Sequence, residues 1–173
     1  FYEEFAGQYY GENAAAAAGL YRRYAAAAIR FGDREDETAG EQFYTHSVKI
    51  LARQWMADTE KAAEHFQWAI PAKTLHEQIC WLDERLAGKA YGYEKYLEDC
   101  EREAPELSDT LTLQVWLHYL GCLGATHFCR AWRLREENHG LEAFYECGLA
   151  AEAFAEADQK LREAERGIWK NFY

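Results

Sequence analysis

Few helix-breaking residues interrupt this chain, and that feature constrains its fold most. Its 173 residues include only two prolines, Pro71 and Pro105. Proline lacks a backbone N–H and has a fixed φ, so long stretches without it can continue as helices. Apolar residues between the breaks recur at steps of three and four, and no segment alternates polar with apolar residues as a strand does. The sequence therefore predicts an all-α fold.

The periodicity places the helices between clear breaks. Two are expected at about residues 1–9 and 12–31, and two more between the charged turn after Gly32 and residue 68. The fifth and sixth are expected at about 74–103 and 109–137, with Ser108 as the cap of the sixth and Gly140 ending it. The third helix has an apolar stripe of Tyr44, Val48, Leu51 and Trp55.

The apolar faces predict how these helices pack. The sixth is apolar on two sides and is therefore expected at the centre. Connections of a few residues make sequential helices antiparallel, which predicts an up-and-down bundle of four to five long helices with short helices at one end. The buried stripes are Ala17, Leu20, Tyr21, Tyr24, Ala28 and Phe31 in the second helix; Leu75, Ile79, Leu82, Leu86, Tyr93, Leu97 and Cys100 in the fifth; and Cys147, Ala150, Phe154, Ala157, Leu161, Ala164 and Ile168 in the seventh.

Composition excludes several classes of partner. The net charge of -11 and a pI near 5.0 argue against nucleic acid and anionic membranes. The longest apolar run, 14–20, falls short of the roughly 20 residues that a membrane span needs. The five cysteines form no Cys-x-x-Cys pair, so we expect free, mostly buried thiols, which favours a reducing, cytoplasmic compartment. The chain starts at Phe1 and stops in an aromatic-rich run, so residues 1–173 are expected to form one helical domain of a longer multidomain protein.

A diiron carboxylate site is the sharpest metal hypothesis for such a bundle. Glu136-x-x-His139 matches the required motif, and the segment around Glu60 is similar to the iron-binding helix of rubrerythrin-like proteins. However, Ala63 stands where the second histidine is needed, which leaves the ligand set incomplete. The sequence therefore predicts no metal and no cofactor, with a ferritin-like diiron protein kept as an alternative.

No complete catalytic motif is present, so no catalytic residue is predicted. His118 and His127 are nine residues apart and lie on opposite sides of one helix, so each is expected to be hydrogen-bonded in or near the core. The loop dense in functional groups is 32–46, where planar polar and aromatic side chains could bind a sugar or a neighbouring domain. The candidate binding residues are Arg34, Asp36, Gln42, Tyr44 and His46, with an ordinary solvated turn as the alternative.

Three segments carry a family resemblance. They are Glu4-Phe-Ala-Gly-Gln-Tyr-Tyr-Gly-Glu-Asn-Ala, Leu20-Tyr-Arg-Arg-Tyr and Arg162-Glu-Ala-Glu-Arg-Gly-Ile-Trp-Lys-Asn-Phe-Tyr. Together they resemble the helical region that follows the catalytic barrel in bacterial glycoside hydrolases of the alpha-glucuronidase type. This resemblance implies a non-catalytic accessory domain that supports or docks on a barrel, with carbohydrate and a second copy as further candidate partners. A tetratricopeptide-like interaction module is the other alternative, although no 34-residue period recurs.

Overall fold

The computed structural model describes residues 1–30, 74–103 and 108–164, and every element among them is helical. This confirms the all-α prediction. The predicted helices between residues 32 and 68 lie outside the described residues. The elements are α1 (Tyr2–Tyr10), the short 3₁₀ helix η1 (Gly11–Asn13), α2 (Ala14–Arg30), α5 (Leu75–Glu103), α6 (Ser108–Glu136) and α7 (Gly140–Ala164).

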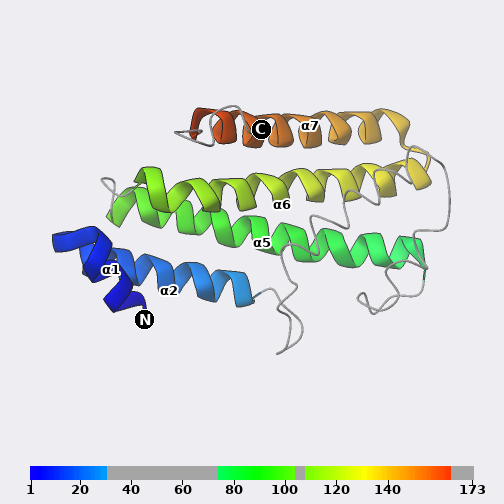
Figure 1. Ribbon diagram of the computed structural model, residues 1–173. Coiled ribbons are helices and arrows are strands. Elements are labelled where there is room, and N and C mark those ends of the chain that lie inside the picture. The colour runs from blue at the N-terminus through cyan, green and yellow to red at the C-terminus, as the bar shows by residue number, and fades with distance from the viewer. Residues whose placement is uncertain (31–73, 104–107, 165–173) are drawn as a thin grey trace.

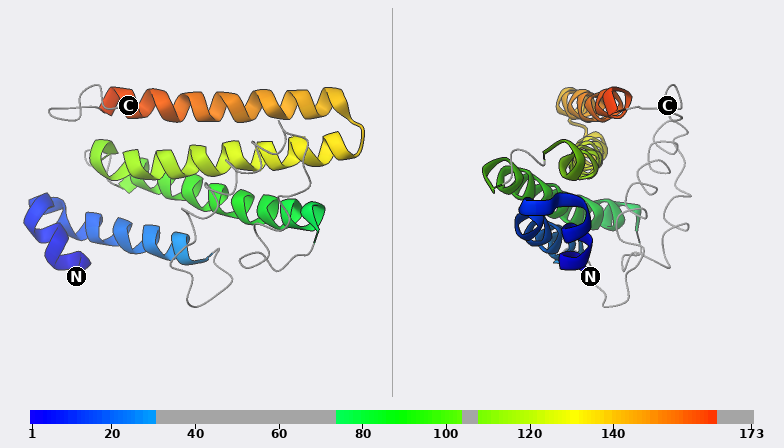
Figure 2. Two further views of the ribbon diagram at one scale, coloured as in Figure 1. Left: turned by 45° about the vertical axis from the view of Figure 1, so that its right-hand side comes forward. Right: turned by 60° about the vertical axis from the view of Figure 1, so that its left-hand side comes forward.

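The long helices form an antiparallel stack (Figure 1). In the order α2, α5, α6, α7, each helix runs antiparallel to its neighbour. Helix α6 lies between α5 and α7 and contacts both. Figure 2 shows α1 folded against α2 at one end. The predicted up-and-down bundle and the central place of α6 are therefore confirmed. None of the described helices is long and apolar enough to cross a membrane.

The core lies along α5, which packs against both α2 and α6. In α5, the predicted stripe from Ile79 to Cys100 is buried wherever its side chains are described. Both small and large side chains of α2 and α6 pack against this stripe. The buried residues that these two helices contribute include Ala17 and Leu20 of α2, and Val115, Cys122, Ala125, Cys129 and Trp132 of α6.

Polar contacts join α2 to α5 at the edge of this core. Arg23 of α2 donates to Glu103 of α5 and also contacts Asp99. Hydrogen bonds from Arg23 and Arg102 lower the pKa of Glu103 to about 2. All of these groups are at least partly open to solvent, so the ion pairs add little to the free energy of unfolding. Their main effect is to favour this register of α2 against α5.

Helix length argues against a repeat module. Both α5 and α6 contain 29 residues. A tetratricopeptide repeat places two helices and their turns within about 34 residues. One α5–α6 pair is nearly twice that long, so the helices do not have the proportions of that repeat.

The turn between α6 and α7 is closed by Asn138, and the prediction that Gly140 ends the sixth helix was wrong. Asn138 has φ 64°, the left-handed conformation that Asn tolerates better than most residues. Its N–H donates to Arg135 O at 3.0 Å and the N–H of His139 donates to Leu134 O at 2.8 Å. These are the two bonds of a Schellman motif, and Gly140 is the first residue of α7.

The buried face of α7 is built mainly from small residues. Ala143, Ala150 and Ala153 are buried against α6, whereas Phe154 remains 39% exposed. The prediction of a buried Phe154 was therefore wrong. A Cβ added to Gly124 of α6 would come within 2.9 Å of its ring, so the ring lies across this glycine at the edge of the contact. The missing side chain of Gly124 leaves room for the ring at this edge, where part of it stays open to solvent.

This contact predicts a coupling between Gly124 and Phe154. Gly124→Ala is expected to destabilise by about 1 kcal/mol, because crowding against the ring outweighs the gain in helix propensity. Phe154→Ala should cost about 1–2 kcal/mol, less than a fully buried ring would. The double variant should cost less than the sum, because removing the ring relieves the crowding. Urea unfolding measures all three.

Gly148→Ala is the matched control, because an added Cβ there meets nothing within 4 Å. It should leave stability unchanged or raise it by up to about 1 kcal/mol. Equal costs of Gly124→Ala with and without the Phe154 ring would contradict the contact.

Candidate functional site

The binding residues predicted from the sequence lie outside the described part of the chain. Arg34, Asp36, Gln42, Tyr44 and His46 all fall within 31–73. Their grouping into a site stays a prediction.

Asp83 is the most enclosed carboxylate of the described residues, and it pairs with two arginines of α6. It is 7% exposed. Arg133 Nη1 donates to Asp83 Oδ2 at 2.9 Å, and Arg130 Nε lies 3.4 Å from Oδ1. The arginines are three apart on one helix and so share a face. A buried carboxylate held this way sets the register of α5 against α6.

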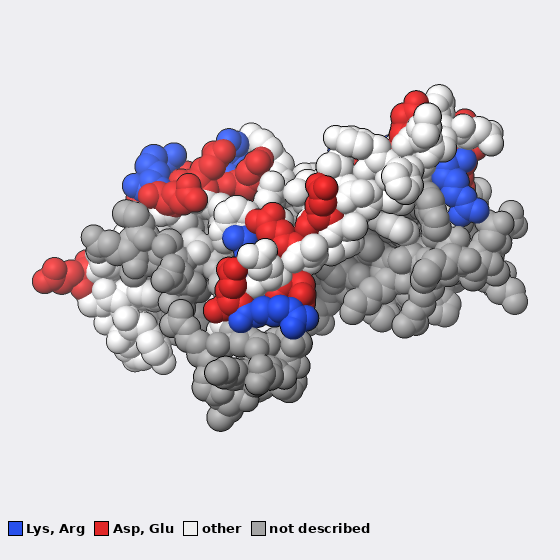
Figure 3. Space-filling model, turned by 90° about the horizontal axis from the view of Figure 1, so that it is seen from above, with Lys and Arg blue, Asp and Glu red and all other residues white. Residues whose placement is uncertain are grey.

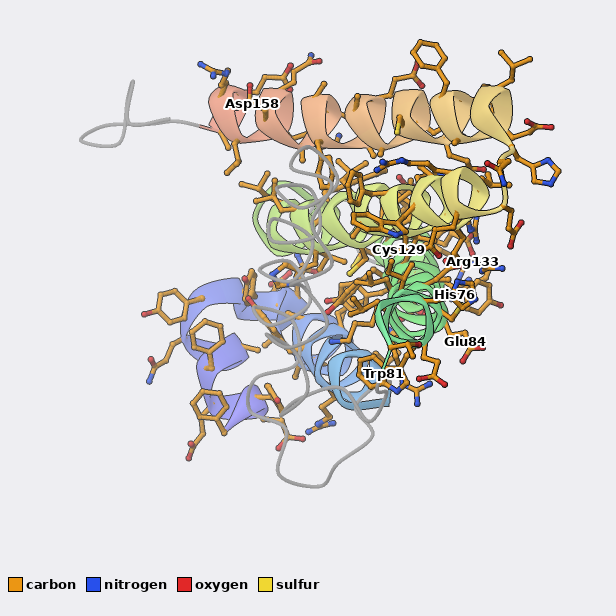
Figure 4. All side chains as sticks on the ribbon, turned by 90° about the vertical axis from the view of Figure 1, so that its right-hand side faces the viewer. His76, Trp81, Glu84, Cys129, Arg133 and Asp158 are labelled. Carbon is orange, nitrogen blue, oxygen red and sulfur yellow. The ribbon has the colours of Figure 1, made fainter. Side chains whose placement is uncertain are left out.

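A second polar group lies at the same end of the two helices. His76 Nδ1 is 2.9 Å from Glu136 Oε2, and His76 Nε2 is 3.6 Å from Cys80 Sγ. Figure 4 shows His76, Cys129 and Arg133 near the α5–α6 junction, with Trp81 on the side of α5 away from α6. Thiol, imidazole and carboxylate follow one another in the order that an activated cysteine nucleophile uses.

The protonation state of Cys80 argues against that use. Burial raises the pKa of its thiol, and the charges of Asp83, Glu136 and Glu84 act in the same direction, while Arg133 opposes them. A nucleophilic cysteine needs a lowered pKa. Burial also raises the pKa of Cys129 well above its ordinary value. Both thiols are therefore protonated near neutral pH, which favours a packing role.

All five cysteines are free, as predicted. Those at 100, 122 and 129 are buried, and those at 80 and 147 are partly buried.

The Glu-x-x-His motif does not act as one unit. Glu136 pairs with His76, whereas His139 lies beyond the helix end, 3.8 Å from Glu142. Glu60 falls outside the described residues. Within the described ranges, no group of three or more His, Cys, Asp and Glu side chains could hold a metal ion.

The two histidines of α6 have separate partners. His127 Nδ1 is 2.6 Å from Glu146 Oε2, which links α6 to α7 in a partly buried position. The His118 ring lies 5.6 Å from the Tyr93 ring, between centroids, on the α5 side. This confirms that the pair does not share a site.

The feature that sequence reasoning missed is the outer face of α7. Leu141, Phe144 and Tyr145 are 86%, 79% and 66% exposed. In the sequence, these residues form a second apolar stripe, on the side of the helix opposite the alanines that face α6. A large contiguous patch of exposed apolar side chains usually marks an interaction site.

Comparisons with protein-family models, curated proteins and solved structures found no match for this chain.

Proposed function

We propose that this chain is a non-catalytic helical accessory domain of a carbohydrate-active, glycoside hydrolase-like protein, and that it supports or docks on a catalytic barrel. The observation that carries the docking role is the exposed apolar face at the start of α7. The sequence resemblance to the helical region of alpha-glucuronidase-type enzymes supplies the kind of partner. A fold alone does not identify a function, so the surface and the resemblance carry the proposal together.

The engagement of the carboxylates supports a non-catalytic role. Glycoside hydrolysis normally needs two carboxyl groups about 5–9.5 Å apart on opposite sides of the scissile bond. Asp83 is held by arginines and Glu136 by His76. Asp158 and Glu98 form ion pairs along their own helices. Carboxylates committed to ion pairs within and between helices suit a scaffold better than an acid–base pair.

The parent protein provides the first test. Its complete coding sequence should specify a catalytic barrel on the N-terminal side of this domain, and the purified parent should hydrolyse glycosides while residues 1–173 alone do not. A parent without a barrel, or turnover of aryl glycosides by this domain alone, would refute the proposal.

The 32–46 segment provides a second test in the same parent. Arg34→Ala and His46→Ala are expected to weaken activity or domain docking, because guanidinium and imidazole groups suit contacts to sugars or carboxylates. Thermal unfolding of the isolated domain should change little. If neither activity nor docking responds, the segment is an ordinary solvated turn.

A further inference from the structure

We infer that the outer face of α7 is a docking surface for one amphipathic helix of the neighbouring domain, and that this helix carries Lys or Arg beside an apolar stripe. The inference rests on the proposed function, because it names the surface and the partner chemistry through which the domain docks. It starts from the two-sided character of α7. One side packs on α6 through alanines, and the opposite side presents the largest apolar groups of the helix to solvent.

The spacing of this outer face is that of a helix–helix seam. Leu141, Gly148 and Ala155 are seven residues apart, and Phe144 and Ala151 each follow a member of that series by three. All five are exposed. Apolar residues at alternating steps of three and four pack against a second helix through knobs and holes. We call Leu141, Phe144, Tyr145, Gly148, Ala151 and Ala155 the outer seam.

The middle of the outer seam is open to a close backbone approach. An added Cβ at Gly148 would meet nothing within 4 Å, and the two seam positions that follow it, Ala151 and Ala155, are alanines. Large residues at one end and small ones along the rest suit a partner helix that crosses near Gly148 and packs its own large side chains over the alanines.

The charges beside the outer seam select the partner. At 100° per residue, Glu142, Glu152, Glu156 and Glu163 fall on one flank of it, and all four are exposed. Glu156 lies 3.8 Å from Lys160 and Glu142 lies 3.8 Å from His139, but these long contacts at exposed carboxylates are weak and leave the flank acidic. Figure 3 views this side of the molecule and shows Asp and Glu side chains beside uncharged surface, with Lys and Arg side chains among them. Opposite charges along a helix seam fix partner choice and orientation.

The same charges disfavour a second copy as the occupant. Two α7 helices paired antiparallel would bring their glutamate flanks together, and like charges across an interface cost free energy. The net charge of -11 adds long-range repulsion between copies. A helix with basic residues beside its apolar stripe is instead attracted both by the glutamate flank and by the net negative charge of the domain.

A pair of synthetic helical peptides tests the surface directly. Each matches the 25 residues of α7 in length and has leucines along one face, with lysines on the flanks of one peptide and glutamates on those of the other. Fluorescence anisotropy with residues 1–173 should show the lysine peptide binding at least about tenfold more tightly. Leu141→Ser with Phe144→Ser should weaken this binding by roughly tenfold or more, because large apolar anchors dominate such contacts. Glu152→Lys with Glu156→Lys should reverse the preference between the peptides.

Tyr91→Ser is the matched control, since Tyr91 is an exposed aromatic residue on α5 and not on α7. It should leave binding unchanged, and circular dichroism checks that every variant is folded. Equal binding of both peptides, or binding that survives loss of Leu141 and Phe144, would overturn the inference. So would a dimer in sedimentation analysis that the same double variant converts to monomer, because the occupant would then be a second copy. A parent without a barrel refutes the proposed function whatever the peptides show, whereas peptide failure beside a barrel-containing parent refutes only this surface.

Discussion

Replacing Asp83 with alanine is expected to lower the free energy of unfolding by about 3 kcal/mol. The carboxylate is buried and joins α5 to two arginines of α6, so its removal leaves guanidinium groups without their partner. The value lies at the low end of the range for broken buried pairs, because both arginines are partly exposed and can turn toward water. Urea unfolding followed by circular dichroism measures the loss.

Glu84→Ala is the control for this prediction. Glu84 is the next residue of the same helix, but it is exposed, so its removal should change stability by less than about 0.5 kcal/mol. Asp83→Asn separates charge from size, because it keeps the shape of the side chain and one carbonyl acceptor. We expect it to cost less than alanine. A loss below about 1 kcal/mol for Asp83→Ala would show that the arginines are satisfied by water.

The fold was predictable because periodicity reports which side of a helix is buried. The stripe of α5 from Ile79 to Cys100 and the two apolar sides of α6 follow directly from steps of three and four. Helix ends were less predictable. The sequence suggested Gly140 as the stop, but Asn138 adopts the left-handed conformation instead. This conformation lets the backbone N–H groups of Asn138 and His139 form the two Schellman bonds.

Side-chain pairing between helices was not predictable. Asp83 meets Arg133 across 50 residues of chain, and His76 meets Glu136 across 60. No local pattern marks such partners, because they depend on the register of one helix against another. Phe154 shows the same limit within one helix, since the distance between α6 and α7 decides whether a large residue in the stripe is enclosed.

Periodicity was also ambiguous in α7, because this helix has two apolar sides. The sequence predicted the side containing Ala150, and the structure places that side on α6. The opposite side, with Leu141 and Phe144, has the same spacing but contacts no described helix. Helix α7 is the last helix of the stack, so its second apolar stripe forms a surface that the described residues of this chain leave uncovered.

A comparison of two leucines separates the core from that surface. Leu86→Ala is expected to cost about 3–5 kcal/mol, because Leu86 is fully buried in α5 and its truncation leaves a cavity among closely packed helices. Leu141→Ala removes the same atoms from a side chain that is almost fully exposed, so it should change the free energy of unfolding by less than about 0.5 kcal/mol. Urea unfolding of both variants measures the difference.

The pair also distinguishes folding from docking. If Leu141 serves a partner helix, its truncation should weaken binding of the lysine-flanked peptide while leaving the stability of the isolated chain intact. Leu86→Ala should do the reverse at temperatures where the variant remains folded, because Leu86 lies in the core and not on the outer seam. A cost near 3 kcal/mol for Leu141→Ala in the isolated chain would instead mean that residues of this chain cover α7, and the outer seam would then belong to its own core.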